Sequence, residues 1–560
     1  MPEPSPSRAG PHPSPGGRGE PPETLPELLA RHAEEGRTAL IVGDRAVGFE
    51  ELADESRRVA QGLRALGIVA GDRVAIWLPS GKAWLACLFG CARIGAVGVA
   101  LNTRFRSHEV GDILSRTGSR AVVFRPDPAG ADLGATLAGC DPDQLRGLEW
   151  VVLEGAAGET AGIGSVVAKP VSYATLAGSN PLEDSVAEGD SACAVFTTSG
   201  TTKAPKFVLH DQRRLIGHGL DVARASGLTA DKRMLLVAPM CGTYGLVTTF
   251  AALSVGAPLV VMETWDPAEA VRLANLHGAT HTMATDDAVA QLLAQAATPR
   301  PLPAMEFVGL AGVNPALGDI FERAEPRGLH LVGLYGSSEL QAIVGLQRPG
   351  GTLEERSGRG GFMVGAGGRV RACDPETGKA LPHGEMGELE FEAPGSRMIG
   401  YLGDEAASRA AHREDGFFRT GDLGRTLADG RFEFVSRLGD SLRLGGFLVN
   451  PAEIEEVIEE LDGVVQAQVV GLQTDAGLRP VAFVIAAGGG QGVDEATVRS
   501  YVGGKLARFK VPIRVFPIEE FPVTVSANAT KIQKGKLRDL AASLVAAGGS
   551  GGERRGGRPA

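Results

Sequence analysis

Short apolar runs alternate with helix-length patterns along most of this chain. The runs are bounded by polar or turn-forming residues, and they lie at 72–79, 192–197, 234–238, 258–262, 306–310 and 330–334. Each run is long enough for a buried strand, and each intervening segment is long enough for a helix. This order is typical of parallel sheets covered by helices. The pattern therefore predicts α/β layering with largely parallel sheets.

The pattern changes after about residue 385, where polar and apolar residues alternate one by one. Residues 388–392 read ELEFE and residues 431–435 read RFEFV. A period of two is typical of antiparallel strands with one face in the core and the other in solvent. We therefore expect half-buried antiparallel strands in this part of the chain.

A compact unit begins beyond Asp440. Asn450 and Pro451 form a strong helix start, a capping residue followed by proline, and Gly463 ends that helix. Strands at 464–470 and 480–485 and an amphipathic helix around 498–506 follow. Because 560 residues exceed one compact domain, we predict a disordered arm at 1–24, a large domain at 25–438, a hinge at 439–442, a small α+β domain at 443–545 and a disordered tail at 546–560.

Charge and cysteine usage restrict the partners and the compartment. The formal net charge is −11, which argues against a dedicated nucleic-acid surface. Six cysteines are scattered without a C-x-x-C pair, and a reducing, cytoplasmic location fits them. The apolar stretches at 83–101 and 245–262 are interrupted by Arg93 and by Pro258, respectively, so we expect no membrane span. The sequence leaves a homodimer open.

The first segment with recognisable chemistry is a loop rich in hydroxyl groups after the apolar run at 192–197. Backbone N–H groups, hydroxyls and ammonium groups are what a triphosphate needs. The loop does not match the Walker pattern, and a Ser/Thr-rich surface loop is the alternative interpretation. The candidate ligands are Thr198, Ser199, Gly200, Thr201, Thr202, Lys203 and Lys206.

Four further segments carry candidate site residues. Glu339 follows an apolar strand, where α/β proteins place ligands, and its carboxylate suits Mg²⁺ on ATP phosphates. Asp422 suits both ribose hydroxyls, although a Gly-Asp turn is the alternative. Charged residues and paired glycines at 437–446 suit a hinge. The basic segment at 530–538 is the last candidate, and a solvated helix is its alternative interpretation.

Together and in this order, these segments resemble the adenylate-forming, or AMP-binding, superfamily, which includes the acyl-CoA synthetases. The resemblance spans roughly residues 25–540. It implies a large N-terminal domain of layered α/β subdomains with a β-barrel-like subdomain, and a small mobile α+β C-terminal domain. It also implies that ATP activates a carboxylic acid as an acyl-adenylate, which passes to coenzyme A.

The resemblance assigns roles to residues around the nucleotide. The hydroxyl-rich loop would wrap the β- and γ-phosphates, with Thr198 among the catalytic groups. Glu339 would bind Mg²⁺. Asp422 and Arg437 would hold the ribose. Adenine would lie between Tyr335, which begins the run Tyr335, Gly336, Ser337 and Ser338, and the opposite wall formed by Gly312, Val313 and Asn314.

The resemblance also assigns roles to the small domain. Asp440 would be the hinge, and Lys531 would be catalytic in the first half-reaction. A lysine and Mg²⁺ would offset the repulsion between the attacking carboxylate and the α-phosphate. The domain would then rotate, and Gly445 and Gly446 would line a tunnel for the thiol because a side chain there would block its approach.

Several residues depart from the pattern of many relatives. Lys203 and Phe207 stand where glycine is frequent, and Thr530 precedes the catalytic lysine where glycine is usual. Histidine is frequent near Gly242 and is missing here. None of these changes removes a charge that the mechanism needs, so they bear on loop kinetics and substrate choice rather than on the reaction class.

The acyl acceptor and the acid are less constrained. Residues 508–512 resemble the corresponding segment of acyl-CoA synthetases, which favours coenzyme A, and the alternatives are a ligase that loads an acyl carrier protein and a non-catalytic nucleotide-binding relative. No aspartate lies near Cys241, which disfavours an amino acid. Asp286 and Asp287 either border the acyl pocket or cap a helix, and Leu334 would narrow the pocket. We expect a short, medium or aryl acid.

Overall fold

The computed structural model describes most of the chain between residues 21 and 549. The described ranges are 21–127, 130, 132–155, 168–198, 205–295, 298–312, 317, 319–375, 377–438, 442–444, 447–449, 451–475, 477–487, 493–526 and 529–549.

One sheet of eight strands contains the first of the predicted apolar runs. Its inner strands are parallel, whereas β9 and β19 add antiparallel at one edge. In spatial order the strands are β19 (Gly400–Tyr401), β9 (Lys206–Asp211), β8 (Ala192–Thr198), β4 (Val97–Ala100), β3 (Arg73–Trp77), β5 (Ser119–Phe124), β6 (Trp150–Leu153) and β7 (Lys169–Ser172).

A second sheet of thirteen strands joins a parallel half to an antiparallel half. Strands β1 and β10 to β14 pair in parallel, and from β15 onward the pairing is antiparallel. The order is β17 (Arg369–Cys373), β18 (Gly387–Glu392), β20 (Phe418–Thr426), β21 (Phe432–Arg437), β16 (Gly360–Met363), β15 (Gly345–Leu346), β14 (Leu331–Tyr335), β13 (Phe307–Ala311), β12 (His281–Thr285), β10 (Met234–Leu236), β11 (Leu259–Val261), β1 (Thr38–Val42) and β2 (Arg45–Gly48).

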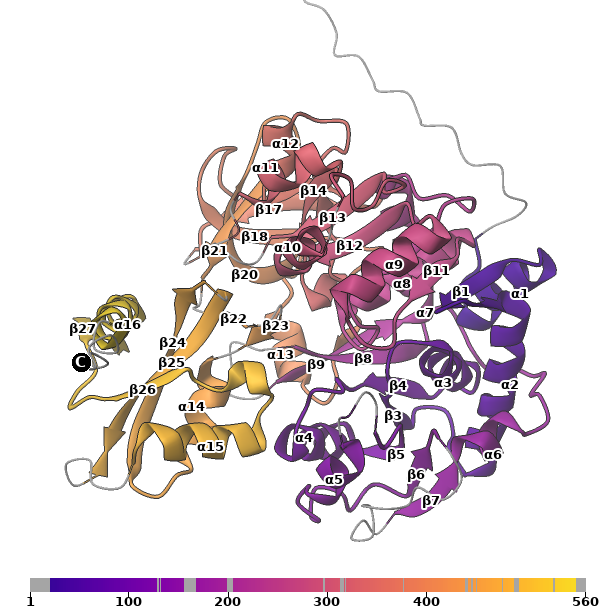
Figure 1. The fold of residues 1–560 in the computed structure, drawn as a ribbon, viewed down its shortest axis with the longest axis horizontal. Helices are drawn as coiled ribbons and strands as arrows, with labels where there is room; N and C mark the ends of the chain where they lie inside the picture. Colours follow the sequence, from indigo (N-terminus) through magenta and orange to yellow (C-terminus); the bar gives the residue numbers. More distant parts are fainter. Residues whose placement is uncertain are drawn as a thin grey trace, which may run out of the picture.

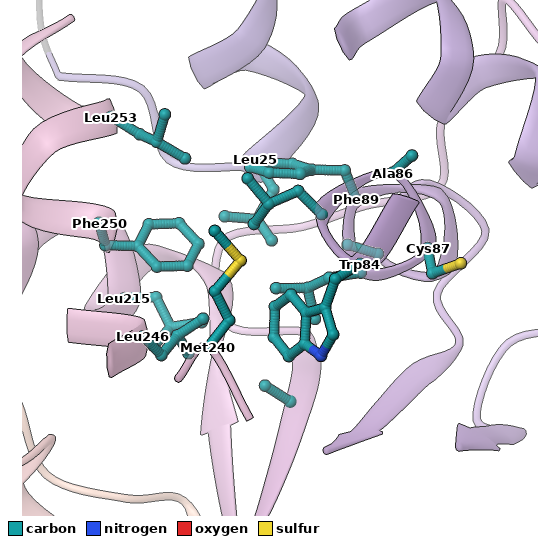
Figure 2. Packing of buried hydrophobic residues seen from close by; sticks show 14 of the residues in the cluster. Leu25, Trp84, Ala86, Cys87, Phe89, Leu215, Met240, Leu246, Phe250 and Leu253 are labelled. Atoms are coloured by element: carbon teal, nitrogen blue, oxygen red, sulfur yellow. The ribbon is translucent and has the colours of Figure 1, made fainter. Parts of the chain in front are cut away.

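Helices separate the two sheets and cover the outer faces of the eight-stranded sheet and of the parallel half of the second sheet. The largest core lies between the sheets, and Figure 2 shows Trp84, Phe89 and Met240 packed within it. Cys87 also lies in this core, as the apolar residues around it in the sequence indicate, and its thiol is free. The helices of this layer are α1 (Leu25–Glu34), α2 (Phe49–Ala65), α3 (Lys82–Arg93), α7 (Gln212–Ser226) and α8 (Thr243–Val255).

Two smaller cores cover the outer faces of the sheets. The outer face of the eight-stranded sheet packs on α4 (Ser107–Thr117) and α5 (Leu133–Ala138). The outer face of the parallel half of the second sheet packs on α9 (Pro267–His277), α10 (Asp286–Ala294) and α11 (Ile320–Ala324). Short helices complete the large domain, namely α6 (Tyr173–Ala177), α12 (Leu353–Ser357) and α13 (Glu405–Ala410).

The C-terminal residues form a separate unit beside the large domain (Figure 1). Its sheet comprises β24 (Val464–Thr474), β25 (Gly477–Ala486) and β26 (Arg514–Pro517). Helices α14 (Pro451–Glu459) and α15 (Glu495–Lys505) pack on one face. The opposite face packs on α16 (Lys534–Gly549) and on Ile532 of the hairpin formed by β27 (Val523–Ser526) and β28 (Ala529–Ile532). A second hairpin, β22 (Leu442–Leu444) with β23 (Phe447–Val449), precedes the unit.

The predicted fold class is confirmed, a large layered α/β domain followed by a small α+β domain. The expectation of half-buried strands is wrong for β18, however. Both Glu388 and Glu390 are buried, because Arg419 pairs with Glu388 and Arg371 and Arg413 pair with Glu390. A buried carboxylate is tolerable when paired in this way.

The expected arm and tail both include ordered residues. Thr24 accepts a hydrogen bond from the Glu27 amide and begins α1 as a capping box, whereas we expected disorder through residue 24. Likewise α16 continues to Gly549, beyond the expected end of the domain at residue 545. Residues 1–20 and 550–560 lie outside the described ranges. Among the described helices, none combines the length and the apolar character that crossing a membrane requires.

Candidate active site

A cavity of about 1580 Å³ lies where the two sheets and the small domain meet. Its walls include the ends of β8, β12, β13 and β14 and parts of β20 and β21, and the parallel strands contribute their carboxyl ends. This edge is where open α/β sheets bind ligands. The cavity brings together nine of the predicted residues, namely Thr198, Lys206, Gly312, Tyr335, Gly336, Ser337, Ser338, Glu339 and Asp422.

Other predicted residues lie outside the described ranges, or only their backbone is described. Outside the ranges are Ser199, Gly200, Thr201, Thr202, Lys203, Val313, Asn314, Asp440, Gly445 and Gly446. The backbone alone is described for Arg437 in β21 and for Lys531 in β28.

Tyr335 joins the parallel half of the second sheet to the antiparallel half. It ends β14, and its hydroxyl donates to Oδ2 of Asp422 in β20 at 2.5 Å. Its ring stacks on Phe391 at 5.5 Å with an interplanar angle of 19°, and Phe434 lies at 5.4 Å. The predicted adenine and ribose residues are therefore in direct contact, on a rigid aromatic support.

Asp422 occupies a register position opposite Arg437. The two residues are directly paired across β20 and β21. The amide of Asp422 donates to Oγ1 of Thr420, and that hydroxyl donates to the carbonyl of Leu389 at 2.6 Å. The antiparallel ladder thus sets the position of Asp422 relative to Tyr335.

Glu339 lies at the apex of a tight reversal between β14 and β15. The turn passes through a 3-10 helix at Ser338–Leu340. Gln341 and Ala342 follow with φ of 54° and 65°, and they are the only non-glycine residues of the described ranges with positive φ. Such a conformation is strained for residues with a Cβ, and strain of this kind gathers at functional sites.

Tyr401 links Glu339 to Lys206. The Tyr401 hydroxyl donates to Oε1 of Glu339 at 3.0 Å, and the Lys206 ammonium lies 4.6 Å from the centroid of the same ring. Sequence reasoning missed Tyr401, because it lies in a two-residue strand whose pairing with β9 is not visible in the local pattern.

Two hydroxyls on the same wall are poised for a ligand. Thr198 ends β8 and is paired across the hairpin with Lys206, so the predicted phosphate loop begins and ends at adjacent points. Oγ1 of Thr198 and Oγ of Ser337 are buried and have no hydrogen-bond partner within the described part of the chain. Buried polar groups usually have partners, so a polar ligand fits this place.

The small domain closes one side of the cavity through Lys510. Its ammonium lies 2.6 Å from Oε1 of Glu109 in α4 and 2.6 Å from Oε1 of Glu453 in α14. Burial would lower the pKa of Lys510, yet the carboxylates of Glu453 and Glu109 outweigh it and raise the pKa. Lys510 is 6% exposed, so this ion pair across the domain boundary is shielded from solvent.

The hairpin that contains Lys531 lies on the other side of the small domain. Alternate residues of β24 and β25 face either α14 and α15 or α16 and Ile532. Since Lys510 and Glu453 contact α4 from the first side, the sheet separates the backbone of Lys531 from this contact. Figure 1 shows β27 and α16 at the outer edge of the small domain.

The cavity continues between α8 and α10. The hydroxyl of Tyr244 in α8 donates to the carbonyls of Ala284 at 3.2 Å and Gly309 at 3.1 Å, which fixes the ring. Leu334 lines the wall, as we expected if its side chain pointed inward. Thr285 caps α10, so Asp286 and Asp287 lie in its first turn, and Asp287 also lines the cavity.

Comparisons with known proteins agree with this geometry. The model of the AMP-binding enzymes matches residues 29–402, and that of their C-terminal domain matches 453–528. A coenzyme A ligase of Mycobacterium tuberculosis, for a propanoate carried on a methylated dioxo-octahydroindene, is 32% identical over 92% of this chain and 99% of its own length. A feruloyl-CoA synthase of an Amycolatopsis species is 28% identical, over 90% of this chain and 95% of its own.

The fold is shared with a solved synthetase. The structure of o-succinylbenzoate CoA synthetase from Bacillus subtilis, bound with a product analogue, superimposes with a TM-score of 0.78 at 24% identity, over 92% of this chain and 98% of that one. Because the larger family model spans well over half of the chain and both domains are matched in order, the chain belongs to the AMP-binding enzyme family, as an AMP-forming acid–CoA ligase.

Proposed function

We propose that this protein converts a ring-bearing carboxylic acid to its acyl-CoA in two steps at the cavity described above. In the first, a carboxylate oxygen attacks the α-phosphorus of ATP and pyrophosphate leaves. In the second, the thiol of coenzyme A attacks the acyl carbon and AMP leaves. The observation that carries the proposal is the convergence of Tyr335, Glu339 and Asp422 with both ends of the hydroxyl-rich loop.

The nucleotide roles follow from these positions. Adenine would stack at Tyr335 opposite Gly312, which has open space where a Cβ would be. Asp422 and Arg437 would hold the ribose from opposed register positions. Thr198 and Lys206 would receive the phosphates at the two ends of the loop, because hydroxyl and ammonium groups neutralise and hydrogen-bond phosphate oxygens.

Glu339 is suited to a magnesium ion. Its carboxylate is a hard oxygen donor that lines the cavity beside the Tyr401 hydroxyl, and Mg²⁺ is usually held by one or two carboxylates together with substrate phosphates. The described residues contain no group of three His, Cys, Asp or Glu that would form an all-protein site. Glu339 would therefore hold the ion jointly with ATP, and the ion would offset negative charge on the phosphates.

The two steps need different positions of the small domain. We propose a hinge at 439–442, centred on Asp440, between the large domain at 25–438 and the small domain, which extends from 443 to the end of α16. In the described arrangement Leu442 and Val449 line the cavity, so the hairpin that contains Gly445 and Gly446 would guide the thiol. Adenylation would require a rotation that moves Lys531 to the α-phosphate.

The acid would lie between α8 and α10. This part of the cavity is lined by aromatic, aliphatic and polar side chains, namely Tyr244, Met262, Trp265, Leu334, Asp287 and Gln291. The relatives named above act on acids with ring systems. An apolar pocket of this kind binds a ring through its area and orients it through few polar contacts.

Tyr244 is expected to set the depth of this pocket. In Tyr244→Ala, kcat/KM for larger acids relative to the preferred acid should rise about tenfold or more, since a methylene in an apolar pocket is worth about 1–3 kcal/mol. Tyr244→Phe, which keeps the ring, is the matched control and should retain the original order. Acyl-CoA formation across a graded series of acids checks this, and an unchanged order in Tyr244→Ala would contradict it.

Lys510 is expected to support the second step only. Lys510→Met leaves the buried Glu109 and the half-buried Glu453 without their cation, so the described arrangement should lose about 3 kcal/mol or more. Single-turnover measurements should show slower transfer to coenzyme A and nearly unchanged acyl-adenylate formation.

Lys505→Met is the matched control for that measurement. Lys505 pairs with Glu460 within the small domain and is 31% exposed, so its loss should change neither step by more than about twofold. Equal slowing of both steps in Lys510→Met would contradict the proposal that Lys510 supports only the domain arrangement used in the second step.

The overall reaction is tested by pyrophosphate release with ATP and Mg²⁺ over a panel of carboxylic acids, each with and without coenzyme A. Release that needs an acid and becomes multiple-turnover with coenzyme A supports the proposal. Release that stalls after about one turnover would point to a carrier-protein acceptor. Absence of release with every acid would favour a non-catalytic nucleotide-binding protein. The homodimer that the sequence leaves open remains a prediction, separate from this test of activity.

A further inference from the structure

Two buried histidines lie directly behind the turn that contains Glu339. His210 belongs to β9 and His218 to α7, and both side chains are almost fully buried. Neither lines the cavity, so neither is placed to touch a substrate. Burial lowers the pKa of His210 to about 4 and the pKa of His218 to about 3, so both rings are uncharged at neutral pH.

His210 contacts the residue immediately before Glu339. Its Nε2 lies 2.9 Å from the carbonyl oxygen of Ser338. Because a carbonyl only accepts, Nε2 carries the proton and donates. The same carbonyl also accepts from the Gln341 amide at a longer distance of 3.3 Å, which closes the 3-10 turn. His210 therefore supplies the shorter of the two bonds at this point.

His218 lies beside the backbone that follows Glu339. Its Nε2 is buried without a hydrogen-bond partner among the described residues, and the backbone of Ile343 and of Gln341 lies close enough to the ring to oppose the lowering of its pKa by burial. Gln341 is itself one of the strained pair and Ile343 directly follows it, since Gln341 and Ala342 have the positive φ values. Strain persists only where surrounding contacts hold it, so the hydrogen bond from His210 and the packing of the buried His218 ring are a physical reason for the turn to keep its shape.

Two further hydrogen bonds hold Glu339 itself. Its carbonyl accepts from the amide of Met398 at 2.8 Å, and its carboxylate accepts from Tyr401. The two ends of the turn approach each other closely, because a Cβ on Gly336 would lie 2.0 Å from the carbonyl oxygen of Ala342. A ligand carboxylate fixed to this degree loses little freedom when it binds a cation.

We propose that His210 and His218 are positioning residues that hold the strained turn at 337–342, and through it the Glu339 carboxylate, in the geometry that binds ATP with its magnesium ion. The inference rests on the proposed function, because it assumes that Glu339 meets the metal-bound phosphates. It assigns the two histidines to the first step alone, since transfer of a finished acyl-adenylate involves no pyrophosphate.

The test compares His210→Gln with His210→Asn and His210→Leu. Glutamine places an amide donor near the position of Nε2, whereas asparagine is polar but too short, and leucine removes the donor. Calorimetry with the magnesium complex of α,β-methylene-ATP should show about tenfold weaker binding for His210→Asn and His210→Leu, and restoration in His210→Gln. His218→Asn should weaken binding in the same direction.

His281→Leu is the matched control. His281 is also buried and its Nε2 bonds to the carbonyl of Ser226 at 3.1 Å, away from the turn. It should lose stability to urea without weaker binding of the ATP analogue. Thiol transfer from a supplied acyl-adenylate, without ATP or Mg²⁺, should stay within about twofold of wild type in the His210 variants.

The outcomes separate the inference from the proposed function. Binding that is unchanged in His210→Asn and in His218→Asn would overturn the inference, and so would equal weakening in His281→Leu or equal loss of thiol transfer. If His210→Leu does not fold, the asparagine and glutamine variants decide. Wild-type protein that does not bind the magnesium complex would instead overturn the proposed function.

Discussion

Replacing Lys531 with alanine is expected to lower the rate of acyl-adenylate formation by about 10²- to 10³-fold, the typical effect of removing one group that stabilises charge in a transition state. The carboxylate and the α-phosphate are both negative, and a lysine between them offsets that repulsion as the new bond forms. Pre-steady-state measurement of pyrophosphate release, at saturating ATP and acid, checks this.

The second step should be spared in the same variant. The backbone of Lys531 pairs with Thr524 on the side of the small domain away from α14, so the arrangement that holds Lys510 against Glu109 does not use it. Transfer from a supplied acyl-adenylate to coenzyme A should stay within about twofold. Lys536→Ala, at an exposed position in α16, controls for loss of charge. Equal loss of both steps would sink the assignment.

Replacing Glu339 with alanine is expected to slow ATP-dependent turnover by about 10²-fold at ordinary Mg²⁺ and to shift the Mg²⁺ titration to higher concentration, because a metal ion contributes several kcal/mol of charge stabilisation. The variant removes the carboxylate that accepts a hydrogen bond from the Tyr401 hydroxyl. Initial rates over a range of Mg²⁺ at fixed ATP measure both effects.

Two companion variants sharpen that measurement. Tyr401→Phe removes only the hydroxyl that positions the carboxylate, so it should give a smaller shift in the same direction. Glu405→Ala removes a carboxylate that is almost fully exposed and pairs with Arg409, and its Mg²⁺ titration should match wild type. An unchanged titration in Glu339→Ala would contradict the metal assignment.

The strands of the large domain were predictable because each is a buried apolar run between turn-forming residues. The run at 192–197 became β8 (Ala192–Thr198), and the run at 330–334 became β14 (Leu331–Tyr335). The helix start at Pro451 was likewise predictable, since its signal is local. Such features depend on neighbours within one turn or one strand, which the sequence displays directly.

Side chains whose environment comes from distant segments were not predictable. Glu390 has the alternating pattern of a solvent-facing residue, yet arginines from β17 and from the segment after α13 pair with it in the interior. Tyr401 reaches Glu339 across 62 residues, and Lys510 reaches Glu109 across 401. The family resemblance identified Glu339 but not the residues that hold its carboxylate in place. The contacts of those residues, such as that of Tyr401, form only when the sheets assemble.

The pairing of strands has a consequence for how the two half-reactions are balanced. Within the described ranges, no strand of the large domain (β1 to β21) pairs with a strand from β22 to β28. No backbone ladder of these ranges therefore joins the two domains. Breaking a ladder would cost many hydrogen bonds, whereas changing the domain arrangement exchanges side-chain contacts such as those of Lys510. The equilibrium between arrangements is then set by a few groups, and about 1.4 kcal/mol at any one of them shifts the populations tenfold. A single substitution at the boundary can therefore make either chemical step the slow one without altering a residue that touches the substrates.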